Sequence, residues 1–394
     1  MNQITPYIAP LLVFGLVVFV HELGHFVAAK IAGVYAPVFS LGWGRRLFGV
    51  RLGETDYRVS LIPLGGYVRM ATREDDSMAG IEGAAGRGTM DANTAAPPDV
   101  DPALWDPTAM APFGPNPVPA DRWVENKSVG ARVIILSAGV IMNILLTLGV
   151  SSGIYYRYGN PYVPAIVDSV MVGAPAAVAG FAAGDRIVGI NGAPVRSWDQ
   201  VLDRVTPTTS GTMTFEIERA GERLSRVVSP QVAEVPDPVT GGLRTVGRVG
   251  IYVRDSLIRE PVGVGAAMVF GGRATWGMAT NVVTVLGGLF TGKVSAKNLG
   301  GPIQIAQTSV AAAKRGAETL WSLIAFLSLN IAILNLVPIP VLDGGQILLV
   351  LAEAVKGSAF SARTREAFAR VGVLAVLGLI VLVTFNDLRS VFTR

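Results

Sequence analysis

The chain has no cysteine, only two histidines and few charged residues among its 394 positions. The absence of cysteine excludes disulfide bonds and thiolate metal ligands. Charged residues make up 16% of the chain and hydrophobic residues 51%, and the mean hydropathy is +0.47. A composition this apolar excludes an ordinary soluble enzyme and indicates long hydrophobic segments that cross a membrane.

Basic residues are also missing from the first 29 positions. The N-terminus therefore lacks the basic segment that begins a cleavable signal peptide, and we expect the first apolar segment to be retained. The net charge is +4, but no basic cluster contains interleaved aromatic residues. We expect no nucleic-acid partner, because basic residues that flank membrane spans explain this charge better.

Four hydrophobic segments each approach the roughly 20 residues that a membrane-spanning helix needs. They are residues 7–29, 133–156, about 319–342 and about 367–386. A fifth apolar stretch, 263–290, contains Arg273 and two Gly-Gly pairs, and we interpret it as interfacial helix rather than a span. The sequence therefore predicts a polytopic α-helical membrane protein with four transmembrane helices.

Three segments between the spans differ in character. Residues 39–70 alternate and are rich in glycine and β-formers, which predicts a small β-structure. Residues 74–120 are rich in Ala, Pro, Gly and Asp, a composition that predicts a flexible loop. Residues 160–255 combine short strand patterns, an Asn-Gly turn and an amphipathic helix, so we expect a compact inserted α+β domain.

The first hydrophobic segment contains the sequence HELGH, an H-E-x-x-H motif. On a helix, His21 and His25 lie on one face and can bind one metal ion, while Glu22 beside that face can act as a general base. A five-residue pattern can match by chance. However, these are the only histidines in the chain, and unpaired polar groups are costly at membrane depth.

Two histidines leave a catalytic metal site one protein ligand short. Without cysteine, the third ligand is expected to be Asp or Glu, and the best candidate is Asp343 in the sequence NLVPIPVLDGG. The same prolines and glycines would also suit a helix end with a solvated Asp343. The missing third ligand favours the metal site, and a His₂Asp set could hold zinc, iron or cobalt.

The metal hypothesis constrains the topology. His21, His25 and Asp343 meet only if the first and third spans run in the same direction, which requires that 263–290 does not cross the membrane. Basic residues flank the loop between spans one and two: Lys30, Arg45, Arg46, Arg51, Lys127 and Arg132. The positive-inside rule places this loop and the metal toward the cytoplasm, and the 160–255 domain outside.

With HELGH in the first span and NLVPIPVLDGG in the third, the chain resembles the site-2 proteases, and most closely the bacterial branch that cleaves anti-sigma factors. The resemblance covers nearly the whole chain. It includes LIPLGGYVRM at 61–70 as a membrane-associated β-loop, NKSVGARVIILSAGVIMN at 126–143, NLGGPIQIAQ at 298–307 and a PDZ-like sequence at 164–198. The expected fold is therefore a polytopic helical membrane protein with a membrane-associated β-loop and an inserted extracytoplasmic PDZ domain.

The resemblance implies roles for particular residues. His21, His25 and Asp343 would bind Zn²⁺, Glu22 would be the catalytic base, and Asn335 would hold the substrate backbone or stabilise the oxyanion. The β-loop residues implied to bind substrate are Gly65, Gly66 and Tyr67. Asn143 is a polar residue inside span two, for which an interhelical hydrogen bond and a catalytic role both stay open.

The composition of the segments and the family resemblance together divide the chain into eight segments. In order these are 1–35 (first span), 36–73 (β-loop), 74–125 (cytoplasmic loop), 126–157 (second span), 158–258 (PDZ), 259–318 (interfacial helices), 319–357 (third span with its motif) and 358–394 (fourth span and C-terminus). Three departures are Val140 after Ala-Gly, Gln346 after Gly-Gly, and room for one PDZ domain where tandem pairs are common. None of them affects the proposed metal ligands.

The implied function is an intramembrane zinc metalloprotease of the bacterial inner membrane. Its partners would be the lipid bilayer and single-span substrates, such as an anti-sigma factor after a first cut. Clearance of remnant signal peptides and a non-catalytic PDZ scaffold are the alternatives. A transporter fits less well, because the four spans contain no inverted repeat.

Overall fold

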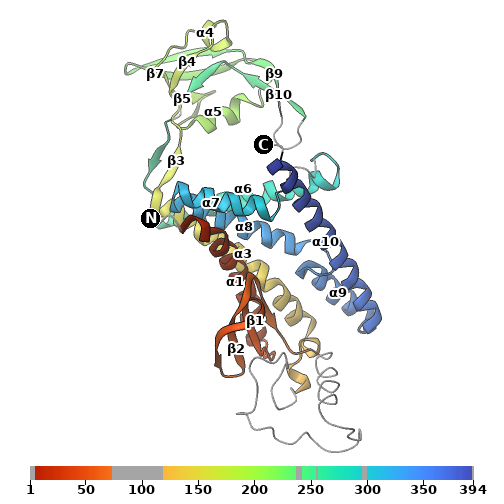
Figure 1. The fold of residues 1–394 in the computed structure, drawn as a ribbon. Helices are drawn as coiled ribbons and strands as arrows, with labels where there is room; N and C mark the ends of the chain where they lie inside the picture. Colours follow the sequence, from red (N-terminus) through yellow and green to blue (C-terminus); the bar gives the residue numbers. More distant parts are fainter. Residues whose placement is uncertain (1–4, 73–118, 237–241, 254–255, 295–299, 393–394) are drawn as a thin grey trace, which may run out of the picture. The chain divides into compact units, whose positions relative to one another are not determined.

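The computed structural model describes residues 5–72, 119–236, 242–253, 256–294 and 300–392 (Figure 1). The chain folds into two units. The first comprises Met1–Ser151, Gly272–Val283 and Ala296–Arg394, and the second comprises Ser152–Gly271 and Thr284–Ser295. Most of the predicted flexible loop, 74–125, lies outside the described residues.

Four helices in the described part of the chain are long and apolar enough to cross a membrane, in agreement with the four predicted spans. They are α1 (Thr5–Ile31), α3 (Val129–Tyr158), α8 (Ala317–Leu336) and α10 (Ala362–Phe392), all labelled in Figure 1. The helix α6 (Val264–Phe290) is not among these candidates, as the Arg273 and glycine content of 263–290 predicts.

Helices α1 and α8 run in the same direction. Val13 and Val17 of α1 share a buried cluster with Ile324 of α8. Further along both helices, the ring of His21 lies against the side chain of Asn335. Residue numbers rise together on both helices, so their C-terminal ends lie together, as the metal hypothesis requires.

Helix α3 runs antiparallel to α1. The ring of His25 contacts Ile135, whereas His21 contacts Asn143, so the order is reversed. Glycine allows a close crossing, because a Cβ atom on Gly24 would collide with the backbone of α3. Small residues at such crossings are typical of helices packed in membranes.

The third span ends earlier than its predicted limit of residue 342. Helix α8 stops at Leu336, and a new helix, α9 (Asp343–Lys356), begins at the predicted ligand. Pro338 and Pro340 separate the two helices, because proline lacks an N–H donor and cannot continue a helix. Asp343 is therefore the first residue of a separate helix.

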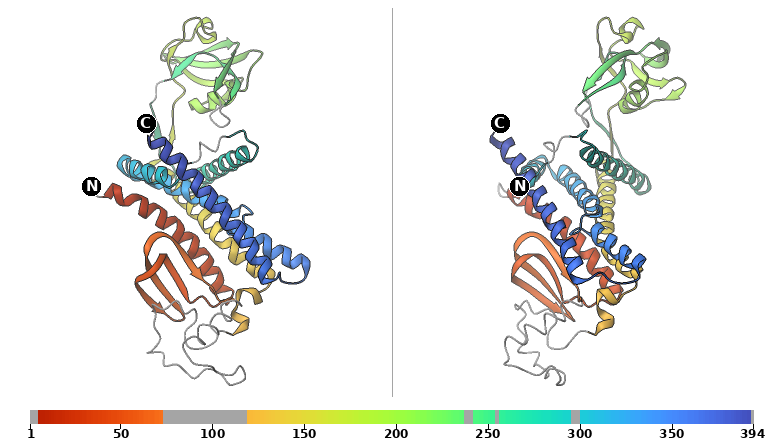
Figure 2. Two further views of the ribbon diagram at one scale, coloured as in Figure 1. Left: turned by 45° about the vertical axis from the view of Figure 1, so that its right-hand side comes forward. Right: turned by 90° about the vertical axis from the view of Figure 1, so that its right-hand side faces the viewer.

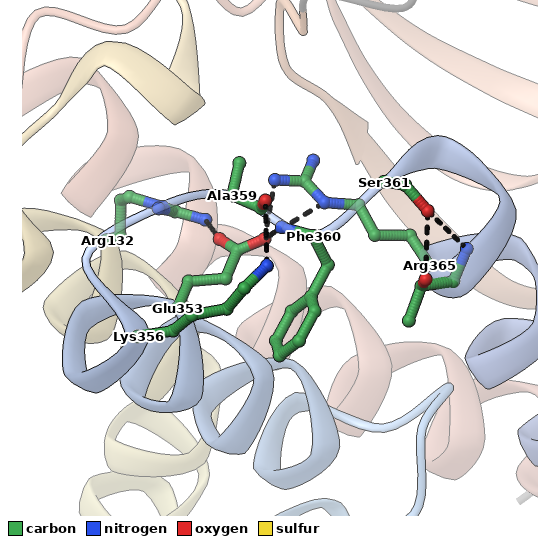
Figure 3. Close-up of polar contacts among 8 residues, drawn as sticks. Arg132, Glu353, Lys356, Ala359, Phe360, Ser361 and Arg365 are labelled. Atoms are coloured by element: carbon green, nitrogen blue, oxygen red, sulfur yellow. Dashed lines mark hydrogen bonds and ion pairs between the residues drawn. The ribbon is translucent and has the colours of Figure 1, made fainter.

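Helix α9 is joined to α3 and α10 by a buried carboxylate (Figure 3). Glu353 accepts hydrogen bonds from Arg132 of α3, from Arg365 of α10 and from the Phe360 N–H. Its side chain is only 6% exposed. These contacts fix the end of α9 opposite to Asp343.

Helix α7 (Pro302–Arg315) packs against α1 and receives its N-terminal cap from α10. The carboxylate of Asp387 accepts hydrogen bonds from the N–H groups of Gly301, Ile303 and Gln304. A side chain on Gly301 would meet that carboxylate. This contact explains a glycine in the NLGGP sequence, since a helix N-terminus leaves N–H groups that need acceptors.

The predicted β-structure is a sheet formed by β1 (Val38–Leu52) and β2 (Thr55–Arg69), and Figure 2 shows it beside α1 in both views. The start of β1, at Val38–Leu41, pairs with two parts of β2, residues 56–59 and 66–69. Residues 66–69 therefore form an edge of the sheet, and no further strand pairs with them in the described residues.

The second unit contains the predicted α+β domain and its own hydrophobic core, which includes Phe215, Ile187 and Val201. A four-stranded sheet has the order β6-β5-β7-β8, and β9-β10, β4-β11 and β3-β12 form pairs. The strands are β3 (Asn160–Tyr162), β4 (Val167–Val170), β5 (Arg186–Ile190), β6 (Ala193–Pro194), β7 (Met213–Arg219), β8 (Glu222–Val228), β9 (Gln231–Pro236), β10 (Leu243–Arg248), β11 (Ile251–Val253) and β12 (Ile258–Glu260). The short helices are α4 (Pro175–Val178) and α5 (Trp198–Val205), and the first unit adds η2 (Ala120–Arg122) and η3 (Val124–Asn126).

Candidate metal centre

The three predicted ligands converge in the first unit. The Nε2 atoms of His21 and His25 lie 3.1 Å apart. The Asp343 Oδ2 atom lies 3.2 Å from the first and 3.5 Å from the second. In the part of the chain that the structure describes, these residues are the one group of His, Cys, Asp or Glu with ligand atoms close enough to hold a metal ion.

The donor set fits a divalent metal such as zinc. The Nδ1 atom of His25 lies 2.8 Å from the carbonyl oxygen of Ile135. A carbonyl can only accept, so Nδ1 carries the proton and Nε2 of the neutral ring has a free lone pair. The Oδ2 atom of Asp343 is buried and has no hydrogen-bond partner. Two imidazoles and one carboxylate are ligand types that zinc prefers, and three protein ligands leave a position open for water.

The HELGH motif places both rings on one face of α1, four residues apart. Space for them depends on α3, where Gly139 is buried. A Cβ atom on Gly139 would collide with the His25 ring and lie 2.7 Å from Cε1 of His21. Sequence reasoning missed this residue, although a small residue within a span is the available signal for a close helix crossing.

Glu22 lies between α1 and the edge of β2. Its carboxylate faces the backbone N–H of Val68. A Cβ atom on Gly66 would lie 3.3 Å from Cγ of Glu22 and 2.8 Å from the carbonyl oxygen of Ser40. The β-loop therefore touches the predicted catalytic base, and glycine at this position permits the contact.

Two asparagines contact His21 from opposite sides. The Asn335 Nδ2 atom of α8 lies 3.2 Å from Nε2 of His21, beside the ligand atoms. The Asn143 Nδ2 atom of α3 lies 3.4 Å from Nδ1, on the other edge of the ring. The amide of Asn335 thus lies on the side of the ring where the metal would bind. The amide of Asn143 lies on the opposite side of the ring, away from the metal position.

The other two predicted β-loop residues have their contacts inside the hairpin. A Cβ atom on Gly65 would lie 2.6 Å from the Trp43 indole nitrogen, and its φ is +115°. The hydroxyl of Tyr67 bonds to Arg58, and its ring packs on Trp43 with centroids 5.3 Å apart. Of the three β-loop residues, the structure brings only Gly66 next to the predicted catalytic residues.

The glycines after Asp343 are explained by the tight turn before α9. A side chain on Gly344 would collide with the Leu336 carbonyl, and one on Gly345 with that of Ile339. The Gln346 amide donates to the Pro340 carbonyl at 2.6 Å. The sequence PIPVLDGG therefore folds back on the end of α8 and directs Asp343 toward α1.

Comparison with known proteins agrees with this geometry. Residues 9–379 match the sequence profile of Peptidase family M50. Zinc metalloprotease RasP of Bacillus licheniformis is 31% identical over 429 residues, covering 98% of this chain and 99% of that protein. Regulator of sigma-W protease RasP of Bacillus subtilis is 29% identical over 427 residues, covering 98% of each.

A solved structure, the PDZ domain of an SdrC-like protein from Listeria monocytogenes, is 22% identical and has a TM-score of 0.19. It covers 24% of this chain and 90% of its own. The family match extends over almost the whole chain and includes both sequences that supply the metal-ligand candidates. The chain therefore belongs to peptidase family M50, the site-2 protease family.

Proposed function

We propose that this protein is an intramembrane zinc metalloprotease that hydrolyses peptide bonds within the transmembrane segment of single-span proteins. The observation that carries the proposal is the convergence of His21, His25 and Asp343 between candidate membrane spans, next to Glu22 and the β2 edge. An enzyme that cuts in the membrane needs such a polar site enclosed by helices, because lipid supplies neither water nor hydrogen bonds.

Zinc would be held by Nε2 of His21, Nε2 of His25 and the carboxylate of Asp343. When bound, zinc supplies Lewis acidity, which polarises a carbonyl group and makes water a better acid. Both rings would bind as neutral imidazoles, so metal binding depends on a proton at each Nδ1 atom. The Ile135 carbonyl oxygen accepts that proton from His25.

Glu22 would act as the general base. Its carboxylate takes a proton from the attacking water as the water oxygen bonds to the scissile carbonyl carbon. It then gives the proton to the leaving nitrogen as the C–N bond breaks. The amide N–H of Asn335, beside Nε2 of His21, would donate a hydrogen bond to the oxygen that becomes negative in this step.

The β2 edge would hold the substrate in an extended form. A transmembrane helix hides its peptide bonds in its own hydrogen bonds, so it must unwind before it is cut. Residues 66–69 pair with β1 on one side only within the described chain, and Gly66 lies against Glu22. Addition of a substrate strand at this edge would align its backbone with the catalytic base.

The second unit would act as a PDZ domain that regulates access. A groove of about 380 Å³ lies between α5 and β11 and includes Val201, Val205 and Ile251 in its lining. Such a groove suits an extended peptide end with apolar side chains. An anti-sigma factor shortened by a first protease is the substrate class we propose, consistent with the sigma-W regulator among the relatives.

The orientation is part of the proposal. Basic residues flank the loop between α1 and α3, and the positive-inside rule then places the metal toward the cytoplasmic face of a bacterial inner membrane. The second unit would lie outside. An inserted domain of this size translocates largely regardless of its own charge.

The test is to purify wild type and Glu22→Gln in detergent, and to measure zinc content and cleavage of a single-span anti-sigma factor in both. We expect zinc in both proteins and cleavage by the wild type alone, because the amide cannot accept the proton. His21→Ala serves as the control that loses both zinc and cleavage. A folded wild type with neither zinc nor cleavage would refute the proposal.

A further inference from the structure

We propose that Asn143 is a positioning residue that orients His21, accepting a hydrogen bond from its Nδ1–H so that Nε2 faces the metal. This inference rests on the proposed zinc site. Asn143 is fully buried in α3, and its side-chain amide lies 3.4 Å from Nδ1 of His21. No sequence motif assigned it this role, and its contact lies on the edge of the ring away from Asp343.

Zinc at Nε2 of His21 would fix the place of the proton on the neutral ring. A metal bound at Nε2 requires the lone pair of that nitrogen, so the proton of the neutral ring is at Nδ1 and needs an acceptor. The amide oxygen and nitrogen of asparagine exchange places when the side-chain amide turns by 180°. Oδ1 of Asn143 is buried without a partner, and this turn brings it to the Nδ1 proton.

The polar side chains near Asn143 make their hydrogen bonds to backbone groups. The hydroxyl of Ser328 donates to the Asn143 backbone carbonyl at 2.9 Å, and Thr147 donates to that carbonyl and to Ala325. Both hydroxyls therefore use backbone acceptors, as expected for polar groups inside a helix bundle. The Asn143 side chain instead faces the ring of His21.

One face of α3 lies against both histidine rings. Ile135, Gly139 and Asn143 are spaced by four residues and are all buried, so they share one face. The Ile135 carbonyl accepts the Nδ1 proton of His25, Gly139 leaves room for both rings, and Asn143 meets Nδ1 of His21. One face of α3 thus contacts the Nδ1 atom of each histidine. These contacts hold the proton of each ring at Nδ1 and leave Nε2 for the metal.

The test compares Asn143→Leu, Asn143→Asp and the matched control Thr147→Val in full-length protein purified in detergent. The readouts are zinc affinity, by competition with a chelator, and the visible absorption of the cobalt-substituted protein. Loss of an outer hydrogen bond to a metal ligand weakens metal binding by about 10- to 100-fold. We expect that loss and an altered cobalt spectrum in Asn143→Leu, with wild-type behaviour in Thr147→Val.

Asn143→Asp keeps an acceptor for Nδ1–H, and we expect its zinc affinity to stay close to wild type. If Asn143→Leu does not fold, Asn143→Ala repeats the test without added bulk. Unchanged zinc affinity in a folded variant without the acceptor would overturn the inference, as would equal losses in Asn143→Leu and Thr147→Val, which indicate packing alone. In both cases a wild type that binds zinc and cleaves leaves the proposed function intact, whereas a wild type without zinc overturns both.

Discussion

At Glu353, a single buried carboxylate contacts two arginines that belong to two other helices. Arg132 and Arg365 donate to it from α3 and α10, and the Phe360 N–H adds a third bond. Burial alone would raise the pKa of this carboxyl, but the hydrogen bonds from Phe360, Arg365 and Arg132 outweigh burial and lower it. The ionised form is therefore the one that the folded protein stabilises.

We predict that Glu353→Gln destabilises the protein by about 3 kcal/mol or more, because it leaves two partly buried guanidinium groups without their counter-charge. Thermal unfolding in detergent measures the change. The matched control is Glu366→Gln, which removes an exposed pair with Arg370 and should change stability little. Equal effects of the two variants would contradict a special role for Glu353.

The sign of the pH dependence follows from the same pKa. Because the folded-state pKa of Glu353 is lowered, the stability it contributes is present above the unfolded-state pKa and is lost as the pH falls through the folded-state value. Wild type should therefore lose stability on acidification, and the difference between wild type and Glu353→Gln should shrink over the same range.

At the scale of elements, the edge of β2 meets α1 at Glu22, the proposed catalytic base. Gly66 touches Glu22, and the backbone N–H of Val68 faces the same carboxylate. The sheet thus presents backbone groups to Glu22. Backbone is also what strand addition requires, since main-chain hydrogen bonds provide affinity that is independent of substrate sequence.

We predict that replacing Gly65 and Gly66 with proline reduces cleavage and leaves zinc bound. Proline fixes φ near −65° and has no N–H, whereas Gly65 has a φ of +115°, so the edge must distort. Cleavage of the single-span substrate and zinc content are measured on the same preparation. Leu61→Ala, at an exposed position of β2, is the control. Unchanged cleavage by the proline variant would rule out this edge as the substrate site.

At the scale of the whole molecule, the candidate metal site and the inserted domain belong to different units. His21, His25 and Asp343 all lie in the first unit, and the second has its own core. Tyr162 of β3 and Ile258 of β12 are paired neighbours, so the chain enters and leaves the inserted domain at adjacent residues. The domain can therefore be removed at this point without separating the flanking chain.

We predict that a short Gly-Ser turn in place of residues 163–257 leaves zinc content unchanged and leaves or raises cleavage of substrates with short external segments. Zinc analysis and the cleavage assay test this directly. A new ability to cut substrates with large external domains would favour a size filter, and slower cutting of substrates with a freshly exposed C-terminus would favour peptide binding. Loss of zinc would contradict the independence of the two units.

The sequence was sufficient to predict the number of candidate spans, the position of the β-structure, and the convergence of His21, His25 and Asp343. Hydrophobic length and the rarity of polar groups at membrane depth are local properties, so a single chain reveals them. The parallel direction of α1 and α8 also followed, because the histidines near the end of α1 must meet Asp343, which comes shortly after α8. The end of α8 was less predictable, since 337–342 stays apolar past the helix end at Leu336.

Only the tertiary structure decided what α3 contributes. Three contacts depend on how α3 crosses α1 and how it is rotated. Gly139 makes room for the two rings, the Ile135 carbonyl meets His25, and Asn143 meets His21. The sequence alone left Asn143 between two roles, and it contained no sign that Glu353 joins three helices. Helix rotation is set by packing of many side chains at once, whereas a metal-ligand motif is set by the spacing of residues along one helix.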